Sequence, residues 1–171
     1  QQEAAVMQVM KSAFQDLGFD EAYIDKAGNA VGIFHRGDGP TIMLNGHLDI
    51  VPIGDVNLWP YPPLAAEIVD GELWGRGSVD MKSAVACMAL AAKDAVDQGF
   101  KGTVIVTAVV MEEIGGFGAR YIHETLKPDL VILGEPSNLS LMLGHRGRIE
   151  MQVIFKGTIA HAAKNELGSN A

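Results

Sequence analysis

Apolar residues recur every three or four positions in two long stretches of the chain, and this spacing predicts amphipathic helices. One stretch covers residues 6–17, with Gly18 as a suitable C-terminal cap. The other begins at Met81 and stops at Gly99. A shorter helix is expected after Gly115-Gly116, where apolar residues again follow a helical spacing.

Runs of apolar and β-branched residues between these helices predict short strands. The expected strands are residues 22–25, 30–36, 41–45, 65–69, 72–74, 103–111, 130–133 and 149–155. The run at 103–111 is a continuous β-branched run and that at 130–133 is apolar, and both are typical of buried strands. Because strands alternate with helices, the pattern indicates an α/β fold: a three-layer domain with a largely parallel central sheet.

A boundary is expected at the motif GHRG, residues 144–147, which precedes the alternating segment GRIEMQVIFKG. We therefore expect residues 1–145 to be the N-terminal part of one domain. Residues 146–171 are expected to begin a smaller α+β domain. The chain starts without an initiator Met and stops abruptly after ELGSNA, so we expect it to be a fragment of a longer protein.

Composition and charge exclude several classes of protein. An apolar share of 48% and a charged share of 20% are typical of a soluble globular domain. The net charge of -8, without any Lys- or Arg-rich run, argues against a nucleic-acid partner. No stretch reaches the roughly 18 apolar residues of a membrane-spanning helix. Cys87 is the only cysteine and is expected in the core; without a disulfide, a reducing compartment, the cytoplasm, is favoured.

Candidate chemistry lies where three of the predicted strands end. His47, the pair Glu112-Glu113 and Glu135 each follow an apolar strand. Because functional groups gather beyond the carboxyl ends of parallel strands, these side chains can converge. Asp80 joins them from the start of the second long helix, although an Asp at that position is also typical of a helix N-cap.

Two short patterns sharpen this picture. His47 and Asp49 form H-x-D, in which a carboxylate can orient a ligating imidazole, although a polar turn explains the pair equally well. Glu112 and Glu113 are adjacent carboxylates, and burying both requires a compensating positive charge. The alternative for this pair is a solvated acidic loop.

An imidazole and several carboxylates are ligands suited to divalent metal ions, with Zn²⁺ the leading candidate and Co²⁺ or Mn²⁺ also suitable. Two such ions can share one bridging Asp, activate a water molecule and polarise a carbonyl group. The sequence offers no G-x-S-x-G nucleophile elbow and no P-loop as a competing site.

Four motifs occur in order along the chain: GHLDIVP, GRGSVDMKSAVA, MEEIGG and LGEPS. Together they resemble the family of aminoacylase, acetylornithine deacetylase, succinyl-diaminopimelate desuccinylase, carboxypeptidase G and the di- and tripeptidases. The resemblance implies that His47 and Glu135 bind a first metal ion, that Asp80 bridges two ions and that Glu113 binds the second. It also implies a cis peptide bond between Asp80 and Met81.

The same resemblance implies further roles. Glu112 would be the general base, and Asp49 would orient the imidazole of His47. The segment after residue 145 would enter a smaller lid domain that mediates homodimerisation. There, His161 would stabilise the oxyanion in the partner subunit's site, and Arg146 would face the substrate carboxylate. Taken alone, a surface or capping role for His161 and a structural ion pair for Arg146 remain open.

One departure from the family is clear: its last metal ligand, a His near the C-terminus, has no counterpart, because neither His123 nor His145 fits. We therefore expect this chain alone to be poorly active. The resemblance implies a metal-dependent hydrolase that cleaves the amide bond of N-acyl amino acids or small peptides. The alternative is a non-catalytic metal-binding relative with a regulatory or scaffolding role; the intact Glu112-Glu113 pair argues against it.

Overall fold

The computed structural model describes residues 3–147, 149 and 151–169. Its internal contacts divide the chain into two units, Gln1–Leu139 and Ser140–Ala171, and each is described by itself. The first unit contains a five-stranded sheet in the order β1-β2-β6-β3-β7. Its strands are β1 (Glu21–Ile24), β2 (Ala30–Arg36), β3 (Thr41–His47), β6 (Gly102–Val109) and β7 (Leu130–Leu133).

The sheet is largely parallel, as the sequence predicts. β3 pairs in parallel with both β6 and β7, whereas β2 is antiparallel to β1 and to β6. All strands of this sheet except β2 therefore run in the same direction. In consequence, the carboxyl ends of β3, β6 and β7 lie at one edge of the sheet.

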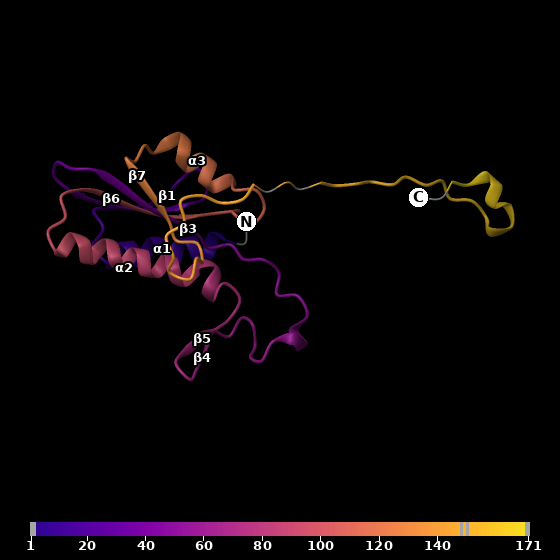
Figure 1. Cartoon of the computed structure of the whole chain (residues 1–171), viewed down its shortest axis with the longest axis horizontal. Helices are drawn as coiled ribbons and strands as arrows, with labels where there is room; N and C mark the ends of the chain where they lie inside the picture. The colour runs from indigo at the N-terminus through magenta and orange to yellow at the C-terminus, as the bar shows by residue number, and fades with distance from the viewer. Residues whose placement is uncertain (1–2, 148, 150, 170–171) are drawn as a thin grey trace. The chain divides into compact units, whose positions relative to one another are not determined.

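Helices cover both faces of this sheet and give the three-layer α/β architecture expected from the sequence (Figure 1). α1 (Ala4–Asp16) and α2 (Ser83–Asp97) pack on one face, where Phe14 and Val85 are fully buried. α3 (Phe117–Thr125) packs on the other face through Ile122. A separate small hairpin is formed by β4 (Glu67–Val69) and β5 (Glu72–Trp74).

Two expectations about burial are wrong. All of β7 is exposed, because it is the last strand in the order and the described residues place no further strand on its outer side. Cys87 is exposed rather than in the core. It lies on α2 between the buried positions Val85 and Met88, but on the side of the helix that faces away from the sheet.

The second unit has little regular structure in its described residues. It contains a short helical segment, Ala162–Leu167, and one isolated bridge between Thr158 and Ser169. The strand expected at 149–155 is not formed among the described residues of that range, and their apolar side chains are exposed. A strand needs a hydrogen-bonded neighbour, and the described part of this unit supplies none there. None of the described helices is both long and apolar enough to span a membrane.

Candidate metal centre

The sheet brings the sequence-predicted ligands together at its carboxyl edge. His47 is the last residue of β3, Glu112 and Glu113 follow β6, and Glu135 follows β7. Asp80 approaches from the segment Ser78–Lys82, which leads into α2. Residues far apart in the sequence thus face one another because three parallel strands end side by side.

Local backbone geometry helps to place the Glu112-Glu113 pair and Asp80 in the cluster. Met111 has a φ of 56°, a left-handed conformation uncommon for a residue with a side chain, and turns the chain directly after β6. Gly46 lets the start of α2 approach β3, because a Cβ there would lie 2.5 Å from Met81 Cε and 2.8 Å from Val85 Cγ2. Asp80 is thereby brought beside His47.

The His47 ring is the hub of the cluster and is only 1% exposed. Its Nδ1 lies 3.0 Å from the backbone oxygen of Asp49, which can only accept a hydrogen bond, so Nδ1 carries a proton. Its Nε2 faces three carboxylates, at 3.0 Å from Asp80 Oδ1 and 3.9 Å from both Glu112 Oε2 and Glu135 Oε1. This nitrogen therefore points to where a metal ion would be held.

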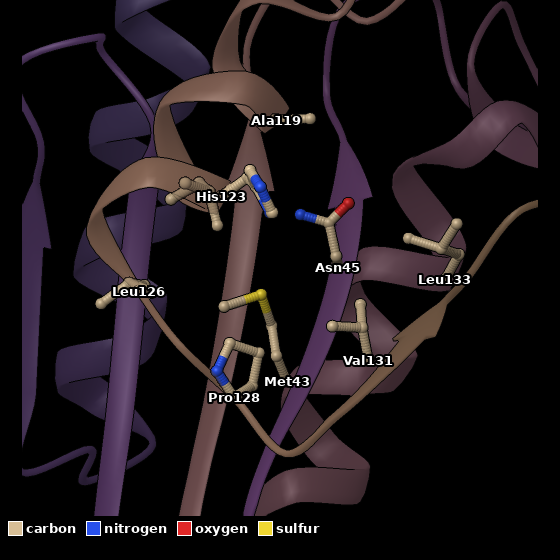
Figure 2. A pocket seen from close by; sticks show the side chains of 9 residues that line it. Met43, Asn45, Ala119, His123, Leu126, Pro128, Val131 and Leu133 are labelled. Carbon is tan, nitrogen blue, oxygen red and sulfur yellow. The ribbon is translucent and has the colours of Figure 1, made fainter.

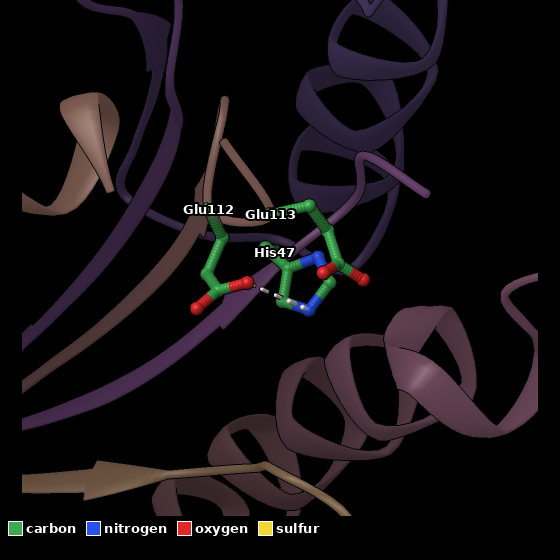
Figure 3. Close-up of side chains that lie close together, drawn as sticks. All are labelled: His47, Glu112 and Glu113. Carbon is green, nitrogen blue, oxygen red and sulfur yellow. Dashed lines mark ion pairs between the residues drawn. The ribbon is translucent and has the colours of Figure 1, made fainter. Parts of the chain in front are cut away.

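Two overlapping ligand sets share His47. In the first, His47, Asp80 and Glu135 offer ligand atoms that all lie within 4.8 Å of one another. In the second, His47 is joined by Glu112 and Glu113 at the same limit. Figure 3 shows the two glutamates on either side of the ring, with Glu112 paired to Nε2.

The electrostatics of the cluster fit a divalent cation. Burial, together with the carboxylates of Asp80 and Glu112, raises the pKa of Glu113. Burial and neighbouring carboxylates likewise raise the pKa of Glu135. For His47, burial acts to lower the pKa, but Glu135, Asp49 and Glu112 outweigh it and raise the value. These carboxylates disfavour one another's ionisation through charge repulsion. A bound cation would relieve that repulsion.

Asp49 is buried and contacts more than the imidazole. Its carboxylate oxygens accept hydrogen bonds from the backbone N–H groups of Glu112 and Glu113, at 3.1 and 3.0 Å. Its Oδ1 is also 3.4 Å from His47 Nδ1, farther than the Asp49 backbone oxygen. Asp49 thus links the β3 and β6 ends of the cluster, a contact that no local sequence pattern could reveal.

The alternative role of Asp80 as a helix N-cap is wrong. The N-cap of α2 is Lys82, and no side chain caps that helix. The Asp80-Met81 peptide bond is cis, as the resemblance implied. Lys82, which was not among the predicted site residues, donates from Nζ to the backbone oxygen of Leu48. Burial lowers the pKa of Lys82, and the charge of Asp49 acts in the opposite direction.

Two hollows lie in the first unit. One of about 590 Å³ opens beside Asp80, and Trp59 and Arg76 line it. The other, of about 210 Å³, lies between α3 and the strands β3 and β7 (Figure 2). Its nine lining residues are mostly apolar and include no Asp, Glu or Cys, so its chemistry does not suit a hard metal ion.

The two remaining candidates, His161 and Arg146, belong to the second unit and are exposed. His161 Nδ1 accepts a hydrogen bond from the backbone N–H of Ala163, which is a local capping contact. The backbone oxygen of Arg146 lies 2.9 Å from His145 Nδ1. Their expected roles toward a substrate stay predictions.

The class of protein that fold and cluster define is an α/β protein with a cluster of His and carboxylate side chains, suited to a metal ion, at the carboxyl edge of its sheet. The chain matches Peptidase family M20/M25/M40 over residues 43–165, and it belongs to that family. The family relationship inferred from the four sequence motifs is thereby confirmed.

Two curated relatives match nearly the whole chain. Uncharacterized protein YgeY of Escherichia coli strain K12 is 33% identical, over 99% of this chain and 43% of that protein. Succinyl-diaminopimelate desuccinylase 2 of Ruegeria sp. strain TM1040 is 35% identical, over 99% of this chain and 47% of that protein. The chain therefore spans less than half the length of these relatives.

A solved structure supports the fold. The M20 family metallo-carboxypeptidase Sso-CP2 from Sulfolobus solfataricus superposes with a TM-score of 0.67. The superposition covers 75% of this chain and 31% of that one, at 24% identity. At this identity the likeness shows a shared architecture.

Proposed function

We propose that this chain carries most of the binuclear metal centre of a hydrolase that cleaves the amide bond of N-acyl amino acids or small peptides. The observation that carries the proposal is the convergence of His47 with carboxylates from three separate segments at the sheet edge. Membership in a peptidase family supports the same class of reaction.

The residues have separable roles in this proposal. His47, Asp80 and Glu135 would hold a first ion, and Asp80 and Glu113 would hold a second. Bound divalent ions supply Lewis-acid chemistry, polarising a carbonyl group and making water more acidic. Zn²⁺ is the proposed metal, with Co²⁺ and Mn²⁺ as substitutes.

Glu112 is the proposed general base. Its Oε2 reaches to 3.9 Å from His47 Nε2, so its carboxylate borders the space where water and substrate would meet. There it accepts a proton from the attacking water and passes it to the nitrogen of the leaving amine. Asp49 accepts hydrogen bonds from the two peptide N–H groups that flank Glu112 and so holds the backbone from which this carboxylate extends.

The variant Glu112→Gln, made in the full-length protein, tests the assignment of Glu112 as the general base. We expect kcat to fall by about 10²- to 10⁴-fold because the amide cannot accept the proton, while the bound metal measured by elemental analysis stays unchanged. Glu124→Gln on the exposed side of α3 is the matched control and should retain full activity. Full activity in Glu112→Gln would remove the general-base role.

The substrate class is tested by a hydrolysis screen. The panel contains N-acetyl and N-succinyl amino acids and dipeptides; the N-succinyl compounds are included because a 35% identical relative is named a desuccinylase. Turnover of any of these with metal, and its loss with a chelator, supports the proposal. Bound metal with no turnover would instead favour the non-catalytic, regulatory or scaffolding alternative.

The assembly and location are part of the same proposal. We propose a homodimer formed through the segment after residue 145, in the cytoplasm, with His161 contributing to the partner subunit's site and Arg146 to the substrate carboxylate. Sedimentation measurements give the oligomeric state. His161→Ala should lower kcat, and Arg146→Ala should raise KM, without loss of the dimer.

A further inference from the structure

Asp80 lies in a segment that departs from regular helical geometry. Between Gly77 and Ser83, Asp80 (φ -118°, ψ 97°) and Met81 (φ -137°, ψ 35°) depart from helical geometry. A regular helix would fix the direction of a side chain through its hydrogen-bond ladder, but these two residues lie outside one. Side-chain contacts of the residues next to Asp80, including the fully buried Met81, therefore contribute to the 3.0 Å distance between Asp80 Oδ1 and His47 Nε2.

Lys82 spans the gap between this segment and the end of β3. Its backbone N–H donates to the carbonyl of Gly77 at 2.9 Å, and its Nζ donates to the carbonyl of Leu48. Leu48 lies between His47 and Asp49, two residues of the cluster. One half-buried side chain thus connects the segment that carries Asp80 with the segment that carries the hub imidazole.

The chain makes room for this side chain. Gly77 has a φ of 84°, and a Cβ there would lie 3.1 Å from Lys82 Cε and 2.6 Å from Ile50 Cγ2. The aliphatic stem of Lys82 therefore passes directly over Gly77 on its way to Leu48. A long side chain that is packed along its stem and hydrogen-bonded at its end has lost most of its rotamer freedom. It can therefore hold the two segments that it joins at a fixed distance.

The ammonium also brings charge to an acidic region. The carboxylates of Asp49, Asp80, Glu112, Glu113 and Glu135 surround His47, and the charge of Asp49 acts on Lys82. A methyl group in place of the ammonium would leave the Leu48 carbonyl without this donor and the carboxylates without this cation. Both losses would loosen the position of Asp80 against His47.

We infer that Lys82 is a positioning residue of the metal centre, holding the Asp80 segment against the His47-Asp49 segment so that both present ligands to the same ion. This inference rests on the proposed metal centre. Side chains that orient ligands from outside the ligand set commonly change metal affinity by about 10- to 100-fold when removed.

The test compares Lys82→Met, which keeps the stem and deletes the ammonium, with wild-type protein and with Lys93→Met. Lys93 lies on the exposed side of α2, where its Nζ pairs with Asp97 at 2.6 Å, so its loss should leave the centre unchanged. Zn²⁺ affinity is measured by competition with a chelator, and the visible spectrum of the Co²⁺-loaded protein reports ligand geometry. Of the two Zn²⁺ ions, we expect Lys82→Met to bind the one with the higher affinity about 10- to 100-fold more weakly than wild-type protein does. The Co²⁺ spectrum should also change.

Chemical rescue separates positioning from a general loss of folding. In a background in which Cys87 and any other cysteine of the whole protein are replaced by Ser, Lys82→Cys is alkylated with bromoethylamine in denaturant and refolded, which restores an ammonium on a stem of lysine length. The background protein with Lys82 intact, treated in the same way, is the reference. Alkylation should return Zn²⁺ affinity and the Co²⁺ spectrum to those of the reference, while the unalkylated protein stays weak; circular dichroism of the metal-free proteins identifies the folded fraction on which affinity is measured.

The outcomes distinguish this inference from the proposed function. If wild-type protein binds neither Zn²⁺ nor Co²⁺, the metal centre itself is wrong. If wild-type protein binds metal and Lys82→Met binds it equally well with the same Co²⁺ spectrum, only the role of Lys82 is wrong. The latter conclusion also follows if alkylated and unalkylated Lys82→Cys bind metal equally.

Discussion

Asn29 offers a test of how the loop that carries Glu112 and Glu113 is held. The side chain is fully buried, and its Oδ1 accepts a hydrogen bond from the backbone N–H of Val110 at 3.0 Å. Its Nδ2 donates to Asp25 Oδ2 at 2.8 Å and to the carbonyl of Gly118 at 3.1 Å. Asn29 therefore ties the turn before β2 to both ends of the loop between β6 and α3.

The perturbation is Asn29→Ala. It leaves the buried Val110 N–H without this acceptor, which costs about 1–3 kcal/mol, and it removes two donated hydrogen bonds worth about 0.5–1.5 kcal/mol each. Because neighbouring contacts are not additive, we expect the free energy of unfolding to fall by about 3–5 kcal/mol in total. The loop at residues 110–118 should also open more often than the rest of the sheet edge.

Urea denaturation gives the first quantity, and hydrogen-deuterium exchange of peptides covering residues 110–118 gives the second. Asn57→Ala is the matched control, because the Asn57 side chain donates to Asp55 in an exposed turn and its loss should cost less than about 0.5 kcal/mol. If Asn29→Ala were as stable as Asn57→Ala, with unchanged exchange in the loop, the buried network would not hold the loop.

Three further outcomes are expected. Gly46→Ala should lower the free energy of unfolding by about 1–3 kcal/mol and reduce metal content, because its Cβ would collide with Val85 beside His47; melting and elemental analysis check this. Zn²⁺ at a hundred times its Kd should stabilise the folded protein by about 2.7 kcal/mol, an effect a chelator should abolish in thermal melts. The N–H of His35 and the Arg36 guanidinium hold the pKa of Asp20 below its ordinary 3.8, so Asp20→Asn should cost about 0.2–1 kcal/mol at neutral pH, and urea titrations should show this difference vanishing as pH falls through the folded pKa.

Periodicity was sufficient to predict most of the fold. The strand expected at 30–36 coincides with β2, and the helix expected at 6–17 overlaps α1 closely. Burial was harder to predict, because an apolar run shows only that a strand can be covered. β7 has such a run and is exposed at the sheet edge, and the segment 149–155 has a strand pattern without a neighbouring strand. Both errors concern the neighbouring elements that would cover or pair with a segment, and a local pattern carries no information about them.

The candidate site divides in the same way. Ligand-type residues at strand ends could be found from the sequence, because a parallel sheet brings such ends together. The contacts that support them could not be found, since each acts across a long separation in the chain: Asp49 on Glu112, Lys82 on Leu48, and Asn29 on Val110. The H-x-D pattern singled out Asp49 only as a neighbour of His47. No pattern distinguishes Lys82 or Asn29 from a solvated side chain.

These three supports explain how a cluster of carboxylates can be ready for a cation. Burial, and then repulsion by neighbouring carboxylates, raises the pKa of both Glu113 and Glu135. This repulsion tends to separate the ionised groups. Asp49 fixes the backbone that carries Glu113, and the strand pairing of β7 with β3 fixes the approach to Glu135. Because the backbone is held by contacts outside the ligand set, the repulsion cannot be relieved by moving the ligands apart. A divalent ion would relieve it instead, so that rigidity around the proposed site would contribute to metal affinity.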